Sequence, residues 1–377
     1  MRRAVLAAIW LLGMTTNARA EPWAVAMESG AEADSNVGRV ETVDGGTTKR
    51  IAAPAARAGA RVGYHLRLFD GFLAVGVSGL ARMVASSKAR DENVMLYIGE
   101  SRWLQPLGTR PLAVGLHLVA ADAFAIRGGT GARTFRNLGA DAMLQVGRED
   151  RHLTLEIGGR DFWYKPRPPN LPAHLFDWRG PVANARLDLL LWQTLDKTRS
   201  LELATILGFE ARSYSSNAMA NCAADGASDP CTMATTLRRR DRYQRAGLEL
   251  RWTGHVVATG SYQATLIDSN SFGQSLIRQR LKGALTMELP GKLFGTATAT
   301  LQLDEYPDGI LIEKDVVKPE FTSLEDENRS SLQILVTRAL STTWSVEARA
   351  AAWRDFANTG EASFRRELIY AGVIYAR

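Results

Sequence analysis

Apolar and polar residues alternate with a period of two along most of the chain that follows residue 20. In segment 293–304, leucine, glycine and alanine occupy the odd-numbered positions, and mainly threonine, glutamine and aspartate occupy the even-numbered ones. Segments 278–289, 344–355 and 152–160 alternate in the same way, with arginine, lysine or glutamate at polar positions. Because successive side chains of a β-strand point to opposite faces, this period predicts strands with one apolar and one charged face. Charged faces repeated strand after strand do not form the core of a soluble β-sandwich.

About sixteen segments show this alternation, and they fill most of the chain after residue 20. We expect strands at 22–33, 53–68, 72–87, 93–104, 110–124, 134–147, 151–163, 180–194, 199–214, 239–252, 255–268, 275–289, 292–305, 328–339, 343–356 and 363–376. The 357 residues after residue 20 (377 minus 20) provide about 22 residues for each strand and its connection. That is roughly twice the 9–11 residues with which a tilted strand crosses a bilayer, so there is room for strand extensions and loops.

The connections between these strands are alternately short and long. Even-numbered connections are tight turns such as 290–291, whereas several odd-numbered ones, including 164–179, 215–238 and 306–327, are long and polar. Long loops therefore collect at one end of the strands, as in an up-and-down outer-membrane barrel. We predict an all-β fold: a transmembrane antiparallel β-barrel of about sixteen strands with both termini in the periplasm. Fourteen or eighteen strands are the alternatives, mainly because residues 306–327 leave room for an additional extension.

Five tryptophans lie within a residue or two of the predicted short-turn ends. They are Trp23, Trp103, Trp192, Trp252 and Trp344. An amphipathic ring is stable at the level of the lipid headgroups, so this clustering predicts an aromatic girdle at one membrane interface. Core tryptophans of a soluble β protein are the alternative, but a soluble core would not align them at one end.

The first 20 residues have the three parts of a secretory signal peptide. Arg2 and Arg3 form the basic start, Ala4–Met14 the apolar middle, and Ala18–Ala20 the small-residue cleavage site before Glu21. We therefore expect residues 1–20 to be removed and residues 21–377 to form one barrel domain. The apolar middle is also the longest uninterrupted apolar run, and it is well short of the roughly 20 residues that a bilayer-spanning helix needs.

The charge of the chain gives little information about partners. The formal net charge of +6 comes from 46 basic and 40 acidic residues. Three of the basic residues lie in the expected signal peptide, which leaves 43 minus 40, or +3. This excess is too small to indicate nucleic acid as a partner.

The C-terminal hairpin carries a resemblance to a known class of proteins. Residues 344–349, Trp-Ser-Val-Glu-Ala-Arg, lead through 358–360 into 364–375, Phe-Arg-Arg-Glu-Leu-Ile-Tyr-Ala-Gly-Val-Ile-Tyr. This hairpin is similar to the closing strands of proteobacterial outer-membrane barrels, including those found with surface-polysaccharide export and surface-lipoprotein modification systems. The resemblance implies a location in the outer membrane of a Gram-negative bacterium. It also implies outer-membrane lipid, lipopolysaccharide and the barrel-assembly machinery as partners, and association with further copies of the chain stays open.

The polar face of each strand is the first candidate for function, because it would line the inside of the barrel. The residues expected there are Arg61, His65, Arg67, Arg82, Glu100, Arg102, Asp141, Glu156, Arg160, Arg186, Asp188, Glu202, Glu210, Arg212, Arg245, Glu249, Arg251, Arg278, Arg280, Lys282, Glu288, Glu347, Arg349, Arg365 and Glu367. Both signs are in near balance, so cross-strand ion pairs are expected. Sixteen strands enclose a lumen wide enough for water, which predicts a wet channel. A salt-bridged or plugged interior that only stabilises the fold is the alternative.

A group of basic residues within this set would suit anionic solutes. Arg278, Arg280 and Lys282 alternate along one strand, and Arg245 and Arg251 lie on a nearby one. An equally open interpretation is that neighbouring glutamates neutralise this stripe.

The two cysteines, Cys222 and Cys231, lie in the long loop 215–238. Asp225-Gly226 and Asp229-Pro230 between them favour turns, so the two thiols can approach each other. We expect a disulfide that stabilises the loop by about 2–3 kcal/mol on the chain-entropy model. Metal binding is not expected here, since no histidine or further cysteine lies nearby in the sequence.

We find no sequence signature of an enzyme, a metal site or a cofactor site. The five histidines, His65, His117, His152, His174 and His255, are scattered along the chain. The acidic segments 304–308 and 325–327 lack the spacing of a calcium loop. The sequence therefore predicts a non-enzymatic, porin-like channel for polar solutes or polymers. The alternatives are an accessory barrel with a largely closed lumen in polysaccharide or lipoprotein export and, third, a barrel enzyme.

Overall fold

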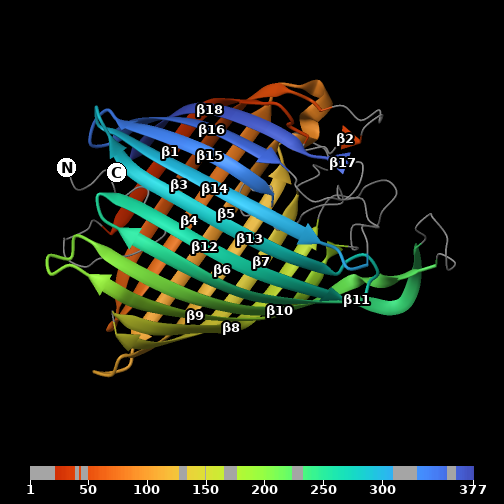
Figure 1. The fold of residues 1–377 in the computed structure, drawn as a ribbon, viewed down its shortest axis with the longest axis horizontal. Helices are drawn as coiled ribbons and strands as arrows, with labels where there is room; N and C mark the ends of the chain where they lie inside the picture. The colour runs from red at the N-terminus through yellow and green to blue at the C-terminus, as the bar shows by residue number, and fades with distance from the viewer. Residues whose placement is uncertain are drawn as a thin grey trace.

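The computed structural model describes residues 22–38, 42–43, 50–126, 134–148, 150–164, 176–222, 232–308, 329–354 and 362–377. Within these residues, sixteen antiparallel strands close into one barrel (Figure 1). Each barrel strand pairs with the barrel strands that precede and follow it in the chain, and the last pairs with the first. The predicted all-β, up-and-down barrel of about sixteen strands is confirmed. No helix among the described residues is long and apolar enough to span a membrane.

Most of the strands begin and end within two residues of the expected positions. The barrel strands are β1 (Trp23–Asp34), β3 (Ala53–Leu68), β4 (Gly71–Val84), β5 (Val94–Pro106), β6 (Leu112–Ala125), β7 (Phe135–Arg148), β8 (Arg151–Tyr164), β9 (Trp178–Gln193), β10 (Ser200–Asn221), β11 (Thr232–Thr253), β12 (Val256–Ser269), β13 (Leu276–Leu289), β14 (Leu293–Glu305), β15 (Ser330–Ala339), β16 (Trp344–Arg354) and β18 (Arg365–Ala376). Two short strands outside the barrel, β2 (Thr42–Val43) and β17 (Ala362–Ser363), pair with each other. A 3-10 helix at Ser87–Glu92 follows β4.

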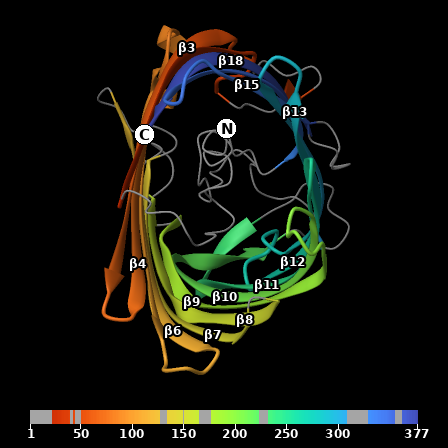
Figure 2. The ribbon, with the colours of Figure 1, turned by 90° about the vertical axis from the view of Figure 1, so that its left-hand side faces the viewer.

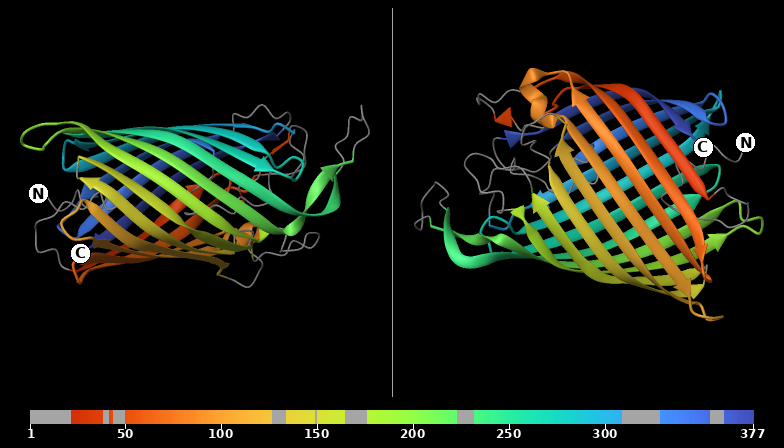
Figure 3. Two further views of the ribbon diagram at one scale, coloured as in Figure 1. Left: turned by 90° about the horizontal axis from the view of Figure 1, so that it is seen from below. Right: turned by 180° about the vertical axis from the view of Figure 1, so that it is seen from behind.

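Strands β10 and β11 are much longer than the sequence pattern predicts. Each has 22 residues, and together they include most of the expected loop 215–238. Their pairing continues past two register irregularities to Asn221 and Thr232. Both strands project beyond the rest of the barrel at the long-loop end (Figures 1 and 3). In the extension, apolar residues such as Met219, Met233 and Leu237 are mixed with polar ones without a period of two, so the alternation that predicts the other strands is missing there.

The barrel closes where β1 pairs with β18. Nine register pairs, from Ala26–Ala376 to Asp34–Leu368, join these two strands. At the end of the pairing, the amide of Val25 donates to the carbonyl of Arg377 over 2.9 Å, and the amide of Arg377 donates back over 2.9 Å. The start of β1 and the end of β18 therefore lie at the short-turn end of the barrel, from which Figure 2 looks into the ring of strands.

The two faces of the barrel wall differ in polarity. Large apolar side chains such as Leu116, Leu248 and Leu281 are about half exposed and lie on one face. Most of the ion pairs lie on the other face, and some of them skip a strand: Arg82 on β4 reaches Asp34 on β1, past β3. Side chains converge on the concave side of a curved sheet, so this pairing identifies the charged face as the inside of the barrel.

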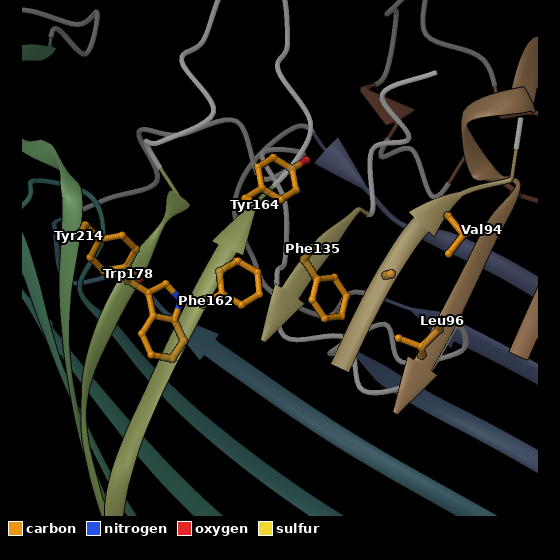
Figure 4. Close-up of a cluster of buried hydrophobic side chains, with 8 residues drawn as sticks. Val94, Leu96, Phe135, Phe162, Tyr164, Trp178 and Tyr214 are labelled. Atoms are coloured by element: carbon orange, nitrogen blue, oxygen red, sulfur yellow. The ribbon is translucent and has the colours of Figure 1, made fainter. Parts of the chain in front are cut away.

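The inward face carries an aromatic cluster near the long-loop end. Phe135, Phe162, Trp178 and Tyr214 lie on the successive strands β7 to β10 and are 6% exposed or less (Figure 4). The ring centroids of Phe135 and Phe162 are 5.6 Å apart, and those of Phe162 and Trp178 are 5.8 Å apart. Both pairs stack, so this part of the inner wall is covered by packed aromatic rings.

Candidate functional site

The inner wall of the barrel is the candidate site, because it collects charged residues from every side of the ring. By the alternation of each strand, all the residues expected inside the barrel from Arg61 to Arg349 share the inward face. The most frequent arrangement is an ion pair between neighbouring strands or between positions i and i+2 of one strand. Pairs of these two kinds are Arg57–Glu28, Arg186–Asp188, Arg212–Glu210, Arg278–Asp304 and Arg349–Glu347.

Arg365 and Glu367 do not belong to this face. They share the outward face of β18 with Ile369, which is 66% exposed, and an ion pair of 2.5 Å joins them there. The residue between them, Arg366, points inward and is 0% exposed. The sequence Arg-Arg-Glu offers charges on both faces of the strand, so alternation alone could not separate them. The expectation of an inward position is corrected for this pair.

Arg366 belongs to a buried charge network that the sequence pattern did not identify. Its guanidinium donates to Asp34 over 3.0 and 2.7 Å, across the β1–β18 closure. Arg82 donates to the same carboxylate over 2.5 Å and also pairs with Glu32. The Arg366 guanidinium also lies 4.7 Å from the ring centroid of Trp353. The network thus ties β1, β4 and β18 together at the long-loop end.

A second cluster lies on β5 to β8 around His117. The two ring nitrogens of His117 lie 3.3 Å from a carboxylate oxygen of Asp141 and 3.2 Å from one of Glu100. Arg160 donates to both oxygens of Asp141 over 2.6 and 2.7 Å. Four charged or titratable groups on four successive strands thus form a row across the wall.

The basic stripe is partly neutralised. Arg278 makes a bidentate pair with Asp304 over 2.8 and 2.9 Å, and Arg280 donates to the amide oxygen of Gln302. Among the described residues, Arg245 and Lys282 have no ion-pair partner. The structure therefore pairs Arg278 with a carboxylate and leaves Arg245 and Lys282 without an ion-pair partner among the described residues.

Exposure along the inward face changes from one end of the barrel to the other. Near the long-loop end, Glu32, Arg82 and Arg366 are buried. Further toward the short turns some inward charges are exposed, as at Arg61 and Lys282, and the side chain of Glu100 is 58% exposed. Others, such as Asp141 and Glu347, are buried there. Water therefore reaches the inner wall at about the middle of strands β3, β5 and β13.

The outward face has a ring of aromatic side chains at the short-turn end. All five tryptophans expected in the girdle lie on this face. Trp192 and Trp252 stack with ring centroids 5.6 Å apart, and Trp344 lies 5.1 Å from Tyr375. Above this ring, the outward face is apolar over the middle of the strands, as lipid requires. The fold is that of a bacterial outer-membrane β-barrel. Such a barrel resides in the outer membrane of a Gram-negative cell.

Comparisons with known proteins find similarity of fold only. No family model matches the outer-membrane barrel, and no curated protein matches it in sequence. Similar solved structures include OprB of Pseudomonas putida, with 8% identity, a TM-score of 0.48 and coverage of 94% of both chains. OccAB3 of Acinetobacter baumannii has 8% identity and a TM-score of 0.44, covering 94% of this chain and 98% of its own. OmpT of Vibrio cholerae has 9% identity and a TM-score of 0.42, covering 95% and 100%.

The remaining sequence expectations concern the cysteines, the acidic segments and the ends of the chain. Cys222 is disulfide-bonded, while its expected partner Cys231 lies outside the described residues. The signal peptide, His174 and the acidic segment 325–327 also lie outside them. Within the described part of the chain, no group of three or more histidine, cysteine, aspartate or glutamate side chains is placed to hold a metal ion.

Proposed function

We propose that the barrel is a porin-like channel through which polar solutes cross the outer membrane, with the long loops outside and both termini in the periplasm. The supporting observation is that three inward-facing charges at mid-barrel height, Arg61, Glu100 and Lys282, are exposed. A charged group in a dry interior would be buried and paired, because desolvating an unpaired charge is costly. Exposed charges on a concave wall are therefore typical of a water-filled lumen.

Passage would be guided by fixed charges without covalent chemistry. Most inward charges are engaged in ion pairs and offer a solute a polar but nearly neutral wall. Arg245 and Lys282 lie on this wall without an ion-pair partner among the described residues, so they would attract anions more than cations. We therefore propose a weak preference for anionic solutes.

Two neighbouring residues on opposite faces of β13 provide a test. Lys282 points inward and Leu281 points toward lipid, and both are exposed in the isolated barrel. Lys282→Cys protein in a planar bilayer should show discrete conductance steps that shrink when a charged, membrane-impermeant thiol reagent is added. Leu281→Cys protein should conduct equally well and not respond to the reagent. If neither variant conducts, or if both respond alike, the channel proposal is wrong.

A second candidate function is an accessory barrel with a largely closed lumen in the export of surface polysaccharide or lipoprotein. The observation that favours it is burial of the inward face toward the long loops, where Phe162, Tyr214 and Arg366 are 6% exposed or less. Silence of well-folded protein in bilayers, together with thiol labelling at position 282 from the periplasmic side only, would support this function. A barrel enzyme is the third class of function. The described partners of His117 and His152 are carboxylates, and no hydroxyl or thiol nucleophile is among these partners.

A further inference from the structure

One part of the outward face is basic instead of apolar. Arg179 on β9 and Arg238, Arg240 and Arg242 on β11 are all exposed, and by strand alternation they point away from the barrel axis. We name these four residues the arginine patch. Three of its members come from the sequence Arg238-Arg239-Arg240-Asp241-Arg242, in which the inward-facing Arg239 and Asp241 pair with each other over 2.5 Å. The alternation thus places one ion pair on the inward face of β11 and three arginines on its outward face.

Strand pairing brings the four arginines close together. Ser213 on β10 is the register partner of both Arg179 and Arg240, so these two arginines flank it on neighbouring strands. With strands about 4.8 Å apart, their Cα atoms are separated by about 10 Å. Arg238 and Arg242 lie two positions to either side of Arg240, or about 7 Å along the strand. The patch is therefore small enough for one lipid headgroup to contact several of its members.

Along the barrel axis, the patch lies at the height expected for the second membrane–water interface, opposite the interface marked by the aromatic ring. Trp252 in the aromatic ring and Arg242 are ten positions apart on the outward face of β11. Ten residues rise about 33 Å along a strand, and a strand tilt of about 40° reduces this to about 25 Å along the barrel axis. The apolar band of outer-membrane barrels is about 25 Å tall. If Trp252 marks one interface, Arg242 marks the other, and Arg240 and Arg238 lie just above it.

The guanidinium groups of the patch are available for a ligand. Within the described part of the chain, none of the four forms an ion pair, whereas arginines of the inner wall are commonly paired. Two carboxylates lie at the margins of the patch: Asp161 is the register partner of Arg179, and Asp268 that of Arg242. Four positive and two negative charges leave an excess of two positive charges on this part of the rim.

We propose that the arginine patch binds the phosphate groups of the phosphorylated glycolipid of the outer leaflet, lipopolysaccharide. Arginine binds phosphate oxygens in a bidentate manner, and such charge-assisted bonds are strongest where water is partly excluded, as between lipid headgroups and a barrel wall. The apolar wall directly below the patch, including Leu248 and Leu266, would contact the acyl chains of the same lipid. This inference rests on the proposed orientation of the long loops toward the outer leaflet but not on channel activity, so conductance and lipid binding can fail separately.

The test compares lipid binding of two triple variants in detergent micelles. The probe is bisphosphorylated lipid A, and binding is followed by native mass spectrometry and by titration of a fluorescent lipid A. Arg238→Gln, Arg240→Gln and Arg242→Gln are combined to remove most of the patch. We expect this variant to bind lipid A at least ten-fold more weakly than the unchanged protein and to keep its heat-modifiable migration on a gel. Dephosphorylated lipid A should bind the unchanged protein as weakly as the variant binds the phosphorylated form.

The matched control removes the same charge from the opposite rim. Arg148, Arg151 and Arg338 are exposed, point outward and lie at the short-turn end, and their combined replacement by Gln should change lipid A affinity less than two-fold. Conversely, Asp161→Asn combined with Asp268→Asn should strengthen binding. Equal weakening in both triple variants, equal binding of dephosphorylated lipid, or displacement of lipid A by millimolar inorganic phosphate would each overturn the proposal, the last in favour of a general anion site.

Discussion

Replacing Asp34 by asparagine should strongly destabilise the closure of the barrel. The side chain is almost isosteric, so the change removes one negative charge and little volume. In the structure, this charge faces two guanidinium groups whose side chains are 0% and 4% exposed, those of Arg366 and Arg82. Removing one partner of a buried pair costs about 3–5 kcal/mol, because the remaining charge stays buried without compensation.

The expected magnitude lies near the lower end of that range. Arg82 keeps Glu32 as a partner, and Arg366 keeps its stacking contact with Trp353. We therefore expect a loss of about 3 kcal/mol in the free energy of unfolding. The assay is reversible urea unfolding in phospholipid vesicles, followed by tryptophan fluorescence and by heat-modifiable migration. The double variant Asp34→Asn with Arg366→Gln should recover part of the loss, since it also removes the buried guanidinium that faced the Asp34 carboxylate.

The matched control is Asp122→Asn on the outward face. Asp122 pairs with Arg136 over 2.6 Å, but their side chains are 29% and 53% exposed. An exposed pair of this kind contributes about 0–1 kcal/mol. If both variants shift the unfolding midpoint by the same small amount, the buried network does not stabilise the β1–β18 closure and our reasoning is wrong.

Three further predictions concern the lumen, the long loops and the aromatic ring. Combining Arg245→Gln with Lys282→Gln should lower the ratio of chloride to potassium permeability in bilayer reversal-potential measurements, because it removes inward charges that form no ion pair with described residues. Cys222→Ser should leave the barrel folded but speed proteolysis between β10 and β11, since the disulfide is worth about 2–3 kcal/mol to that loop. Trp192→Ala should lower stability in vesicles by about 1 kcal/mol beyond the loss of apolar area, through loss of stacking on Trp252.

The fold was predictable because lipid imposes one rule on every strand. A strand between lipid and water must alternate apolar and polar side chains, and the barrel strands follow this rule where they cross the lipid. The sequence pattern therefore gave most strand ends to within two residues. It failed at the outer parts of β10 and β11, which extend past the lipid. There apolar and polar residues are mixed without a period of two, and the strands are held by pairing with each other, so alternation could not predict them.

The charged residues of the wall were predictable as a set but not as pairs. Alternation assigns a face to Arg278 or Glu347 directly, since apolar neighbours occupy the other face. It cannot do so for Arg365, Arg366 and Glu367, three consecutive charges of which one points inward. Ion pairs such as Arg366 with Asp34 join residues 332 positions apart, and only the closure of the barrel brings them together. Pairing therefore required the register of the strands as well as their pattern.

On both faces of the barrel wall, some charged side chains form ion pairs and others do not, and the two groups serve different purposes. Towards the long loops, inward charges such as Arg366 and Arg82 are buried and paired, so they hold the wall together and offer little to a solute. At mid-height, the inward Lys282 is exposed, and at the long-loop rim so is the outward Arg240; neither has an ion-pair partner among the described residues. An exposed, uncompensated cation contributes little to the stability of the barrel, because water screens it. Such a cation is available to an external anion: a solute in the lumen, or a lipid phosphate at the rim. We therefore assign function to these positions rather than to the stronger ion pairs.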